Sequence, residues 1–242
     1  MEQNESTVIK YEILPYISDN MSIFEIATTT TLPCWQKVFK SMESNLKFID
    51  KLYEKHNYKV FPQKNYIFEA FNRIQIEDIK VILLSEEPLK DVGYNGLAYC
   101  SDKKDRLSKV TMIIYDEIKK NYPEFDIPLH GDISCWCNQG VLLLHCSLTS
   151  VLSESNKLNF IWLSIISKLF QAISEKRKNC IYLIWGDKIK DYISYIPKTS
   201  IIMNAIDPYK WLYGKNTYCD HFKKINDLLI SWKETPINWD VI

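Results

Sequence analysis

The fold of this chain is decided by one stretch, His130-Gly131-Asp132-Ile133-Ser134-Cys135-Trp136-Cys137-Asn138-Gln139-Gly140-Val141-Leu142-Leu143-Leu144. It ends in a run of four apolar residues, which is the length of a buried strand. Three further runs of this kind lie at residues 81–84, 181–185 and 201–203. We therefore predict four short, buried strands.

Helical patterns lie between these runs. In the clearest one, the apolar residues are spaced to make one wide face; they are Leu158, Ile161, Trp162, Ile165, Ile166, Leu169, Phe170 and Ile173. Strands that alternate with helices predict an α/β fold with a central, largely parallel four-stranded sheet flanked by helices. Ligands of such sheets bind at the carboxyl ends of the strands, so the loops after Leu84, Leu144, Trp185 and Met203 are the candidate site.

The chain of 242 residues, 46% of them hydrophobic, is long enough for one sizeable core. We predict one domain over residues 31–242, preceded by an N-terminal leader of unknown role at residues 1–30. No stretch approaches the roughly 20 apolar residues of a membrane span, and the acidic start is unlike a targeting peptide. We therefore expect an intracellular protein that is not secreted and has no membrane partner.

Cysteine content and charge limit the function further. The number of cysteines is odd, and they lie in apolar contexts, which favours reduced thiols in the core over a disulfide framework; they are Cys34, Cys100, Cys135, Cys137, Cys146, Cys180 and Cys219. Thirty basic residues balance thirty acidic ones. Proteins that bind nucleic acid usually carry a basic excess, so the composition does not by itself indicate a DNA-binding protein.

Each of the four candidate loops resembles a motif of the family-1 uracil-DNA glycosylases, in the family's order. The stretch from His130 is similar to the family's HGDLSGWAKQGVLLLN. Coverage extends over about residues 33 to 240, and the further matches are Pro33-Cys34-Trp35, Tyr58-Lys59-Val60-Phe61-Pro62, Gly96-Leu97-Ala98-Tyr99, Ile184-Trp185-Gly186, Cys219-Asp220-His221-Phe222 and Pro236-Ile237-Asn238-Trp239. The resemblance implies the fold of that family.

The resemblance also implies a chemistry. The family extrudes a deoxyuridine from DNA into a closed pocket and breaks the bond between base and sugar. In the motif GQDPYH an aspartate orients water and a tyrosine excludes the methyl group of thymine. A phenylalanine stacks on the base, an asparagine reads its edge, and a histidine in HPSPLS stabilises the leaving uracil anion.

The first motif reads Ser85-Glu86-Glu87-Pro88-Leu89-Lys90. The resemblance places Glu86 and Glu87 in the base pocket, with Glu87 at the aspartate position and Leu89 at the tyrosine position. Glu87 keeps a carboxylate on a longer side chain, and a displacement of about 1 Å can cost about a hundredfold in rate. Leu89 does not supply the aromatic wall that rejects thymine.

At the base-reading position the sequence has His145, and at the stacking position it has Tyr99. An imidazole does not offer the paired donor and acceptor that an asparagine amide turns toward uracil. Tyr99 remains suited to stacking. A buried histidine also has a structural interpretation, which we keep open for both His145 and His130.

The final motif reads Ala205-Ile206-Asp207-Pro208-Tyr209-Lys210-Trp211. Counting back without gaps from His221 places Ile206 at the histidine position, and a shift of one residue places Asp207 there. Isoleucine donates no hydrogen bond, and a carboxylate repels an anion. Losing one donor to a developing anion costs about 3–4 kcal/mol, so neither alignment restores the chemistry.

The DNA-contact positions also depart from the family. Lys210 takes the place of a leucine that wedges into the duplex, with Trp211 beside it as an alternative wedge. Gly186 and Asp187 replace a glycine-serine pair that binds phosphate, and residues 105–108 replace a proline-rich loop. We expect an acidic rim, made of Glu86, Glu87, Asp187 and Asp207 and offset in part by Lys90 and Lys210, and hence weak, non-specific DNA binding.

The cysteines and histidines near the central stretch do not predict a metal site, because Cys135-x-Cys137 lacks the usual ligand spacing. We expect neither metal nor another cofactor.

Two functions follow from these observations. The first is a glycosylase-fold protein that has lost base excision and acts as a DNA- or protein-binding scaffold. Poxvirus relatives of the family serve as processivity subunits, so the resemblance implies replication or repair proteins as partners, in the nucleus or wherever DNA is replicated. The second is an active glycosylase with an altered base preference, in which Glu87 activates water. A third interpretation, a decoy for glycosylase inhibitors, rests on the fold alone.

Overall fold

The computed structural model describes residues 17–18, 20–56, 60–88, 93–151, 155–211 and 219–241. Its centre is a four-stranded sheet in the order β3-β2-β5-β6, and every neighbouring pair in it is parallel. The strands are β2 (Val81–Ser85), β3 (Val141–His145), β5 (Ile181–Trp185) and β6 (Ile201–Ala205). The predicted α/β class and the parallel four-stranded sheet are confirmed.

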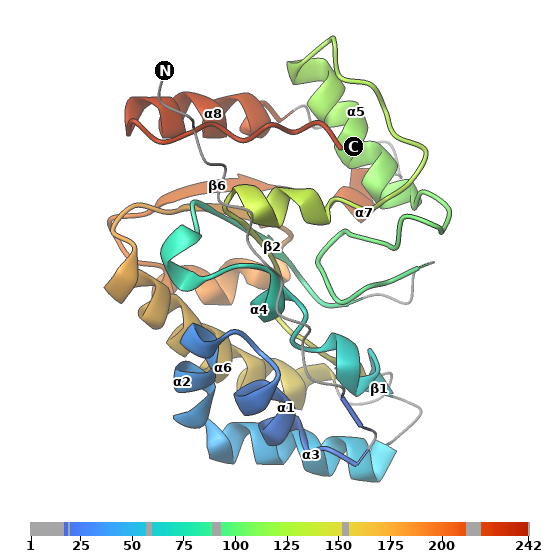
Figure 1. Cartoon of the computed structure of the whole chain (residues 1–242), viewed down its shortest axis with the longest axis vertical. Helices are drawn as coiled ribbons and strands as arrows, with labels where there is room; N and C mark the ends of the chain where they lie inside the picture. Colours follow the sequence, from blue (N-terminus) through green and yellow to red (C-terminus); the bar gives the residue numbers. More distant parts are fainter. Residues whose placement is uncertain are drawn as a thin grey trace, which may run out of the picture.

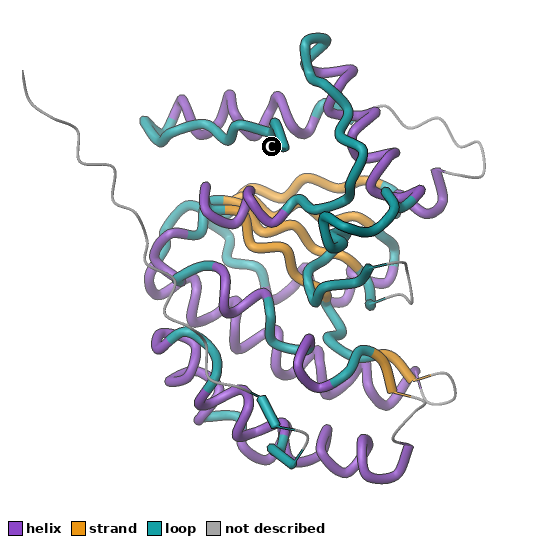
Figure 2. The backbone as a smooth tube through the Cα atoms, turned by 45° about the vertical axis from the view of Figure 1, so that its right-hand side comes forward, coloured by secondary structure: helices purple, strands orange, loops and turns teal. Residues whose placement is uncertain are grey.

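Helices cover both faces of the sheet. One layer holds α1 (Ile23–Thr29), α2 (Pro33–Lys40), α3 (Glu43–His56) and α6 (Ser155–Lys176), and the opposite layer holds α5 (Lys109–Asn121) and α8 (His221–Ser231) (Figure 1). Figure 2 shows the strands stacked between these layers. The helix predicted from its apolar face at residues 158–173 lies within α6. In the described part of the chain, no helix is both long and apolar enough to cross a membrane.

Shorter elements connect these layers. The helices α4 (Ala70–Arg73) and α7 (Pro208–Trp211) are single turns, and β1 (Val60–Phe61) pairs with β4 (Ser150–Val151) in a separate antiparallel ribbon. The 3₁₀ segments are η2 (Lys64–Tyr66), η3 (Ile76–Asp78), η4 (Ser134–Gln139) and η5 (Lys188–Tyr195).

The strands differ in burial according to their place in the sheet. Every residue of β2, β3 and β5 is buried, as expected for strands covered on both faces. In contrast, β6 is partly exposed, and Ile201 at its start is 38% exposed, although β3 at the other edge of the sheet is buried throughout. The prediction of a fully buried strand at residues 201–203 was therefore wrong, because a short apolar run does not reveal how completely the rest of the fold covers a strand.

The stretch that begins at His130 packs against the C-terminal segment and leads into β3. Trp136 in η4 is fully buried; its indole Nε1 donates to the carbonyl of Trp239 (3.2 Å), and the two rings meet at right angles. Gly140 ends η4 at a φ of +105°, and a Cβ there would lie 2.9 Å from the carbonyl oxygen of Asp78. Only glycine fits this turn without strain, and it delivers the chain directly into β3.

The N-terminal boundary differs from the prediction. Helix α1 lies inside the range 1–30 assigned to a leader, and Ser22 and Glu25 form a capping box at its start. Ile23 and Ala27 are fully buried in the main core. The boundary predicted at residue 30 therefore divides one core, while residues 1–16 lie outside the described part of the chain.

Candidate functional site

The carboxyl ends of the strands bring the predicted loops to one edge of the sheet. Ser85 at the end of β2 pairs with His145 at the end of β3, and Trp185 at the end of β5 pairs with Ala205 of β6. The segments that follow these four strand ends carry most of the predicted site residues. This is the location expected for a ligand site in a parallel sheet.

A pocket of about 40 Å³ opens at this edge. A cavity needs about 10–15 Å³ of such volume for each water, so the pocket has room for about three waters. Its lining joins the ends of β2 and β3 to the start of α5 and includes three of the predicted residues: Glu87, Tyr99 and His145. The others are Ser85, Tyr94, Cys100, Ser101, Ser108, Val110, Thr111 and Tyr209.

Tyr99 has an unusual backbone conformation for a residue with a side chain, with a φ of +60°. Its carbonyl accepts a hydrogen bond from Thr111 Oγ1 (3.0 Å), in the first turn of α5, and its ring lies 5.5 Å from that of Trp185. Burial raises the pKa of Tyr99 well above its usual range, so the ring is neutral. Left-handed residues of this kind cost about 1–3 kcal/mol and cluster at functional sites.

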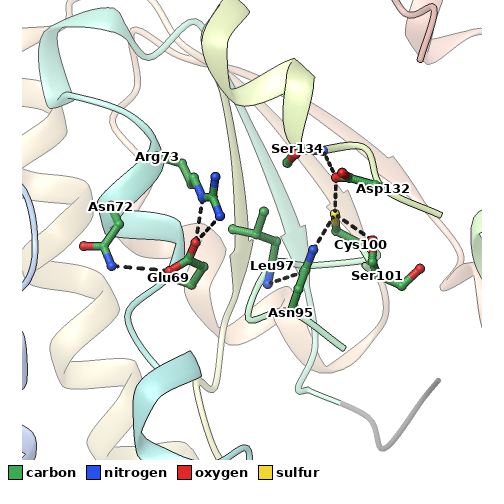
Figure 3. Close-up of polar contacts among 9 residues, drawn as sticks. All are labelled: Glu69, Asn72, Arg73, Asn95, Leu97, Cys100, Ser101, Asp132 and Ser134. Carbon is green, nitrogen blue, oxygen red and sulfur yellow. Dashed lines mark hydrogen bonds and ion pairs between the residues drawn. The ribbon is translucent and has the colours of Figure 1, made fainter. Parts of the chain in front are cut away.

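The loop that carries Tyr99 is tied to the stretch that begins at His130 (Figure 3). Asn95 accepts from the Leu97 amide (3.3 Å) and donates to Cys100 Sγ (3.2 Å), and the Cys100 thiol donates to Asp132 Oδ1 (3.6 Å). Asp132 in turn accepts from the Ser134 amide (3.0 Å). Asp132 is therefore part of the support behind the pocket.

His130 is also structural in this arrangement. Its Nδ1 accepts from the amide of Asp132 (3.2 Å), and its carbonyl accepts from the hydroxyl of Tyr115 (3.0 Å). It does not line the pocket. Of the two interpretations left open for His130, the structure supports the structural one.

His145 is buried beside the pocket and has no hydrogen-bond partner at either ring nitrogen among the described residues. Burial lowers its pKa to about 3, so the imidazole is neutral near pH 7 and presents one donor and one acceptor. The ring of Tyr94 lies 5.9 Å away at an angle of 35°. An unsatisfied buried polar group costs about 1–3 kcal/mol, and a bound ligand is one way to recover that cost.

Glu87 reaches the pocket from the loop after β2, but its carboxylate is already paired. Its Oε1 lies 2.9 Å from Lys188 Nζ, which is also 3.5 Å from Glu86 Oε2. Glu86 Oε1 accepts from the backbone amide of Lys188 (3.1 Å) and packs on Gly186, where a Cβ would lie 2.6 Å from that oxygen. The absence of a side chain at Gly186 thus makes room for Glu86.

The acidic side chains at the rim of the pocket are paired with more lysines than the sequence analysis predicted. Asp187 lies 2.9 Å from Lys210 and 3.0 Å from Lys190, and hydrogen bonds from these lysines lower its pKa to about 2. Together with Lys188, three lysines face the rim carboxylates. The predicted acidic rim is therefore largely compensated, and Lys188 and Lys190 were not part of that prediction.

Neither of the two residues proposed for the leaving-group position lines the pocket, but Asp207 is hydrogen-bonded to Tyr209, which does. The Oδ1 of Asp207 accepts from the Tyr209 amide (2.8 Å). Burial raises the pKa of Asp207, and the charge of Glu86 raises it further; Asp207 in turn raises the pKa of Tyr99. Ile206 is half-buried and does not line the pocket. Neither residue places a hydrogen-bond donor there.

Three of the predicted side chains cannot be placed. Leu89 and Lys90 lie outside the described residues, as does the side chain of Trp211. Among the residues that are described, no group of three or more histidine, cysteine or acidic side chains is arranged to hold a metal ion.

A larger hollow of about 350 Å³ lies beside the pocket and shares Glu87 with it. Its lining combines carboxylates with aromatic rings: Glu86, Glu87, Cys146, Ser147, Phe160, Leu163, Lys188, Asp191 and Tyr192. The smaller pocket is the better candidate for the base, because it holds Tyr99 and the unpaired nitrogens of His145.

Comparison with known proteins decides the family. The uracil-DNA glycosylase of Dichelobacter nodosus is 33% identical over 184 residues, which is 75% of this chain and 80% of that protein. The chain belongs to the uracil-DNA glycosylase family. The enzyme of Campylobacter fetus is 31% identical over 217 residues, or 86% of this chain and 92% of that protein. No protein-family model matches the chain.

Solved structures of uracil-DNA glycosylases share the fold. The crystal structure of the mimivirus enzyme covers 86% of this chain and 87% of its own, with 24% identity and a TM-score of 0.74. A mimivirus UNG variant in complex with UGI covers 87% and 89%, with 24% identity and a TM-score of 0.73.

In this member of the uracil-DNA glycosylase family, sequence reasoning missed Tyr94 and Tyr209, which line the pocket, and Lys188, which pairs with Glu87. Tyr94 and Lys188 stand in loops or 3₁₀ structure, where no apolar period marks them. Only the meeting of the loops after β2, β5 and β6 brings them together. Their aromatic and cationic character was visible, but their proximity to Glu87 and His145 was not.

Proposed function

We propose that this member of the uracil-DNA glycosylase family binds DNA and accepts an extruded pyrimidine in the pocket of Tyr99 and His145, and that it has lost most of the family's base-excision rate. Enzymes that act on a base must take it out of the stack and read it in a closed pocket. Tyr99 offers a face for stacking, and the free nitrogens of His145 offer hydrogen bonds.

The observation that carries the loss of rate is the sequence of the segment after β6. Where the family needs a donor to the departing anion, this chain has Ile206 or Asp207, and neither an alkyl side chain nor a carboxylate donates a hydrogen bond. The missing donor alone costs about 3–4 kcal/mol, which is two to three decades of rate. The repulsion between a carboxylate and the leaving anion adds to this cost.

The pairing of Glu87 supports the same conclusion. A carboxylate stabilises a cationic sugar through its negative charge. Lys188 Nζ lies 2.9 Å from Oε1 of Glu87, and the lysine charge offsets the negative charge that would stabilise the sugar cation.

The charge distribution supports weak, non-specific DNA binding. The chain has equal numbers of acidic and basic residues, and three rim lysines are already paired with carboxylates. Phosphates have to compete with these carboxylates for the lysines, so DNA binding is weak, and added salt weakens it further. Such a protein acts as a scaffold at sites of DNA replication or repair, inside the cell, with replication or repair proteins as further partners.

A second candidate, an active glycosylase that uses Glu87, is favoured by one observation. Glu87 lines the same pocket as Tyr99 and His145, so the carboxylate, the stacking ring and the base-reading position are assembled. Relatives at 31–33% identity carry the name uracil-DNA glycosylase.

An excision assay separates the two candidates. Single-stranded and duplex oligonucleotides with uracil or a thymine mismatch are incubated with wild-type protein, with Glu87→Gln, and with the control Glu124→Gln, which replaces an exposed glutamate outside the pocket. Base-dependent binding with excision at or near background supports our proposal. Rapid excision that Glu87→Gln abolishes and Glu124→Gln preserves would establish the active enzyme instead.

A further inference from the structure

The larger hollow, of about 350 Å³, has no part in the proposed binding of a base. Among the described residues, its lining shares Glu87 alone with the pocket of Tyr99 and His145. Its walls come from the loops after β2 and β3, from the helix α6 and from the 3₁₀ segment η5. Ligand sites commonly measure about 300–1,000 Å³, so the hollow has the size of a binding site.

The walls of the hollow are held together by hydrogen bonds. Tyr192 of η5 is buried, and its hydroxyl donates to the carbonyl of Cys146 (3.0 Å). The amide of Ser147 donates to the carbonyl of Glu86 (3.0 Å). Because these bonds tie η5 and the loop after β2 to the loop after β3, the hollow is already formed in the free protein.

Two side chains of the lining are open to solvent. The side chain of Phe160 in α6 is 75% exposed, although it is large and apolar. Asp191 in η5 is also exposed, and its carboxylate forms no ion pair with any other residue that the structure describes. An exposed aromatic ring and an open carboxylate therefore line the same hollow.

The lining carries an excess of negative charge. Glu86, Glu87 and Asp191 contribute three carboxylates, and Lys188 is the one basic side chain in the described lining. The ammonium of Lys188 already lies 2.9 Å from Glu87 and 3.5 Å from Glu86. The hollow therefore favours a cation and opposes the phosphate groups of DNA.

A guanidinium group has the properties that this lining matches. It is planar and always positively charged, it donates paired hydrogen bonds to a carboxylate, and it stacks on aromatic rings. Free arginine carries its own carboxylate, which the acidic lining opposes, so an arginine within a polypeptide fits better.

We propose that the hollow is a docking site for an arginine side chain of a protein partner, with the carboxylate of Asp191 and the ring of Phe160 as its main contacts. The site does not require that a base enters the pocket of Tyr99 and His145. It therefore goes beyond the proposed function and gives the chemistry by which a protein partner is recognised.

Two blocked tripeptides test this inference. One carries arginine between two glycines, and the other carries citrulline, which keeps the planar shape of the side chain and lacks its charge. Each is titrated at low salt into the isotope-labelled full chain, and NMR reports the shifts of the backbone amides. We expect the arginine peptide to shift the amides of Ser147 and Asp191 saturably and to bind about tenfold more tightly than the citrulline peptide.

Variants at the opening of the hollow locate the binding. Asp191→Asn and Phe160→Ala each weaken binding of the arginine peptide by about two- to fivefold. The matched controls are Asp116→Asn in α5 and Phe48→Ala in α3, which replace exposed residues outside the hollow and leave binding unchanged. All four side chains are exposed, so these variants keep the packed core.

Three results overturn the inference. If the two peptides bind equally, the charge of the guanidinium is not recognised. If Asp191→Asn and Phe160→Ala bind the arginine peptide as tightly as the wild-type protein does, the peptide binds elsewhere. If an undamaged single-stranded oligonucleotide shifts the amides of the lining and the arginine peptide does not, the hollow is a nucleic-acid site. The binding of a base is tested separately by the excision assay, so the two proposals fail independently.

Discussion

Removing the charge of Lys188 tests how strongly its ion pair restrains Glu87. The ammonium lies 2.9 Å from Glu87 and 3.5 Å from Glu86, and the side chains of Lys188 and Glu87 are 61% and 27% exposed. Ion pairs at exposed positions contribute about 0.2–1 kcal/mol. Lys188→Met therefore costs less than about 1 kcal/mol of stability, and by freeing Glu87 it raises excision at most about fivefold, because 1.36 kcal/mol corresponds to a factor of ten in rate.

This gain is small beside the effect of the missing donor. A donor to the leaving anion contributes about 3–4 kcal/mol, or two to three decades of rate. We expect the residue at the leaving-group position, and not the ion pair, to limit excision. Lys188→Met by itself then leaves the protein a poor glycosylase.

Single-turnover excision of uracil from a single-stranded oligonucleotide measures this prediction. The variants are Lys188→Met, Glu87→Gln and their combination, and Lys190→Met is the matched control, because Lys190 pairs with Asp187 and not with Glu87. A rise of 100-fold or more in Lys188→Met would refute the reasoning, since the ion pair would then account for most of the lost rate. A rise that persists when Glu87 is also replaced would show that Lys188 acts through another group.

Three further predictions follow from the geometry. Asp207→His supplies a donor and removes a repelling charge, so excision in the same assay rises by about 10²–10³; a comparable gain in Ile206→His instead would show that Ile206 faces the leaving base. Burial lowers the pKa of His145 from 6.5 in the unfolded chain to about 3 in the folded protein. Between these values the unfolded chain binds a proton and the folded protein does not, so the free energy of unfolding decreases as the pH falls from 6.5 toward 3. His145→Gln reduces this loss in urea unfolding at pH 7 and pH 5, and equal pH dependence in the two proteins contradicts the burial of His145. Trp239→Ala removes a ring that packs on Trp136 and donates to the carbonyl of Phe222 (3.2 Å). We expect this variant to lower the free energy of unfolding by about 3–5 kcal/mol. A cost below about 1 kcal/mol would show that the C-terminal segment is not part of the core.

Sequence reasoning succeeded where the signal is local. The runs that became β2, β3 and β5 are continuous and apolar, because both faces of these strands are covered. The face of α6 is visible from its spacing alone. Burial of β6 was mispredicted, because the cover over a strand depends on what packs on it in the fold, which its own residues do not record. Helix α1 was assigned to a leader although it packs into the core.

The site was accessible to sequence reasoning only in part. The motif resemblance identified Glu87, Tyr99 and His145, and the structure brings all three to one pocket. It did not identify Tyr94 or Lys188. Both contact residues that are distant in the sequence, His145 for Tyr94 and Glu87 for Lys188, and neither stands at a position that the family motifs mark.

Local pattern and motif order were sufficient to establish the α/β class, the parallel sheet and the family to which the chain belongs. These properties depend on burial along one strand or one helix face, which the order of residues records directly. The pairing of Glu87 with Lys188, the ring of Tyr94 beside His145 and the position of Asp207 near Glu86 emerged only from the folded chain. Distances between groups on separate loops are set by how the strands align, and no local pattern encodes them.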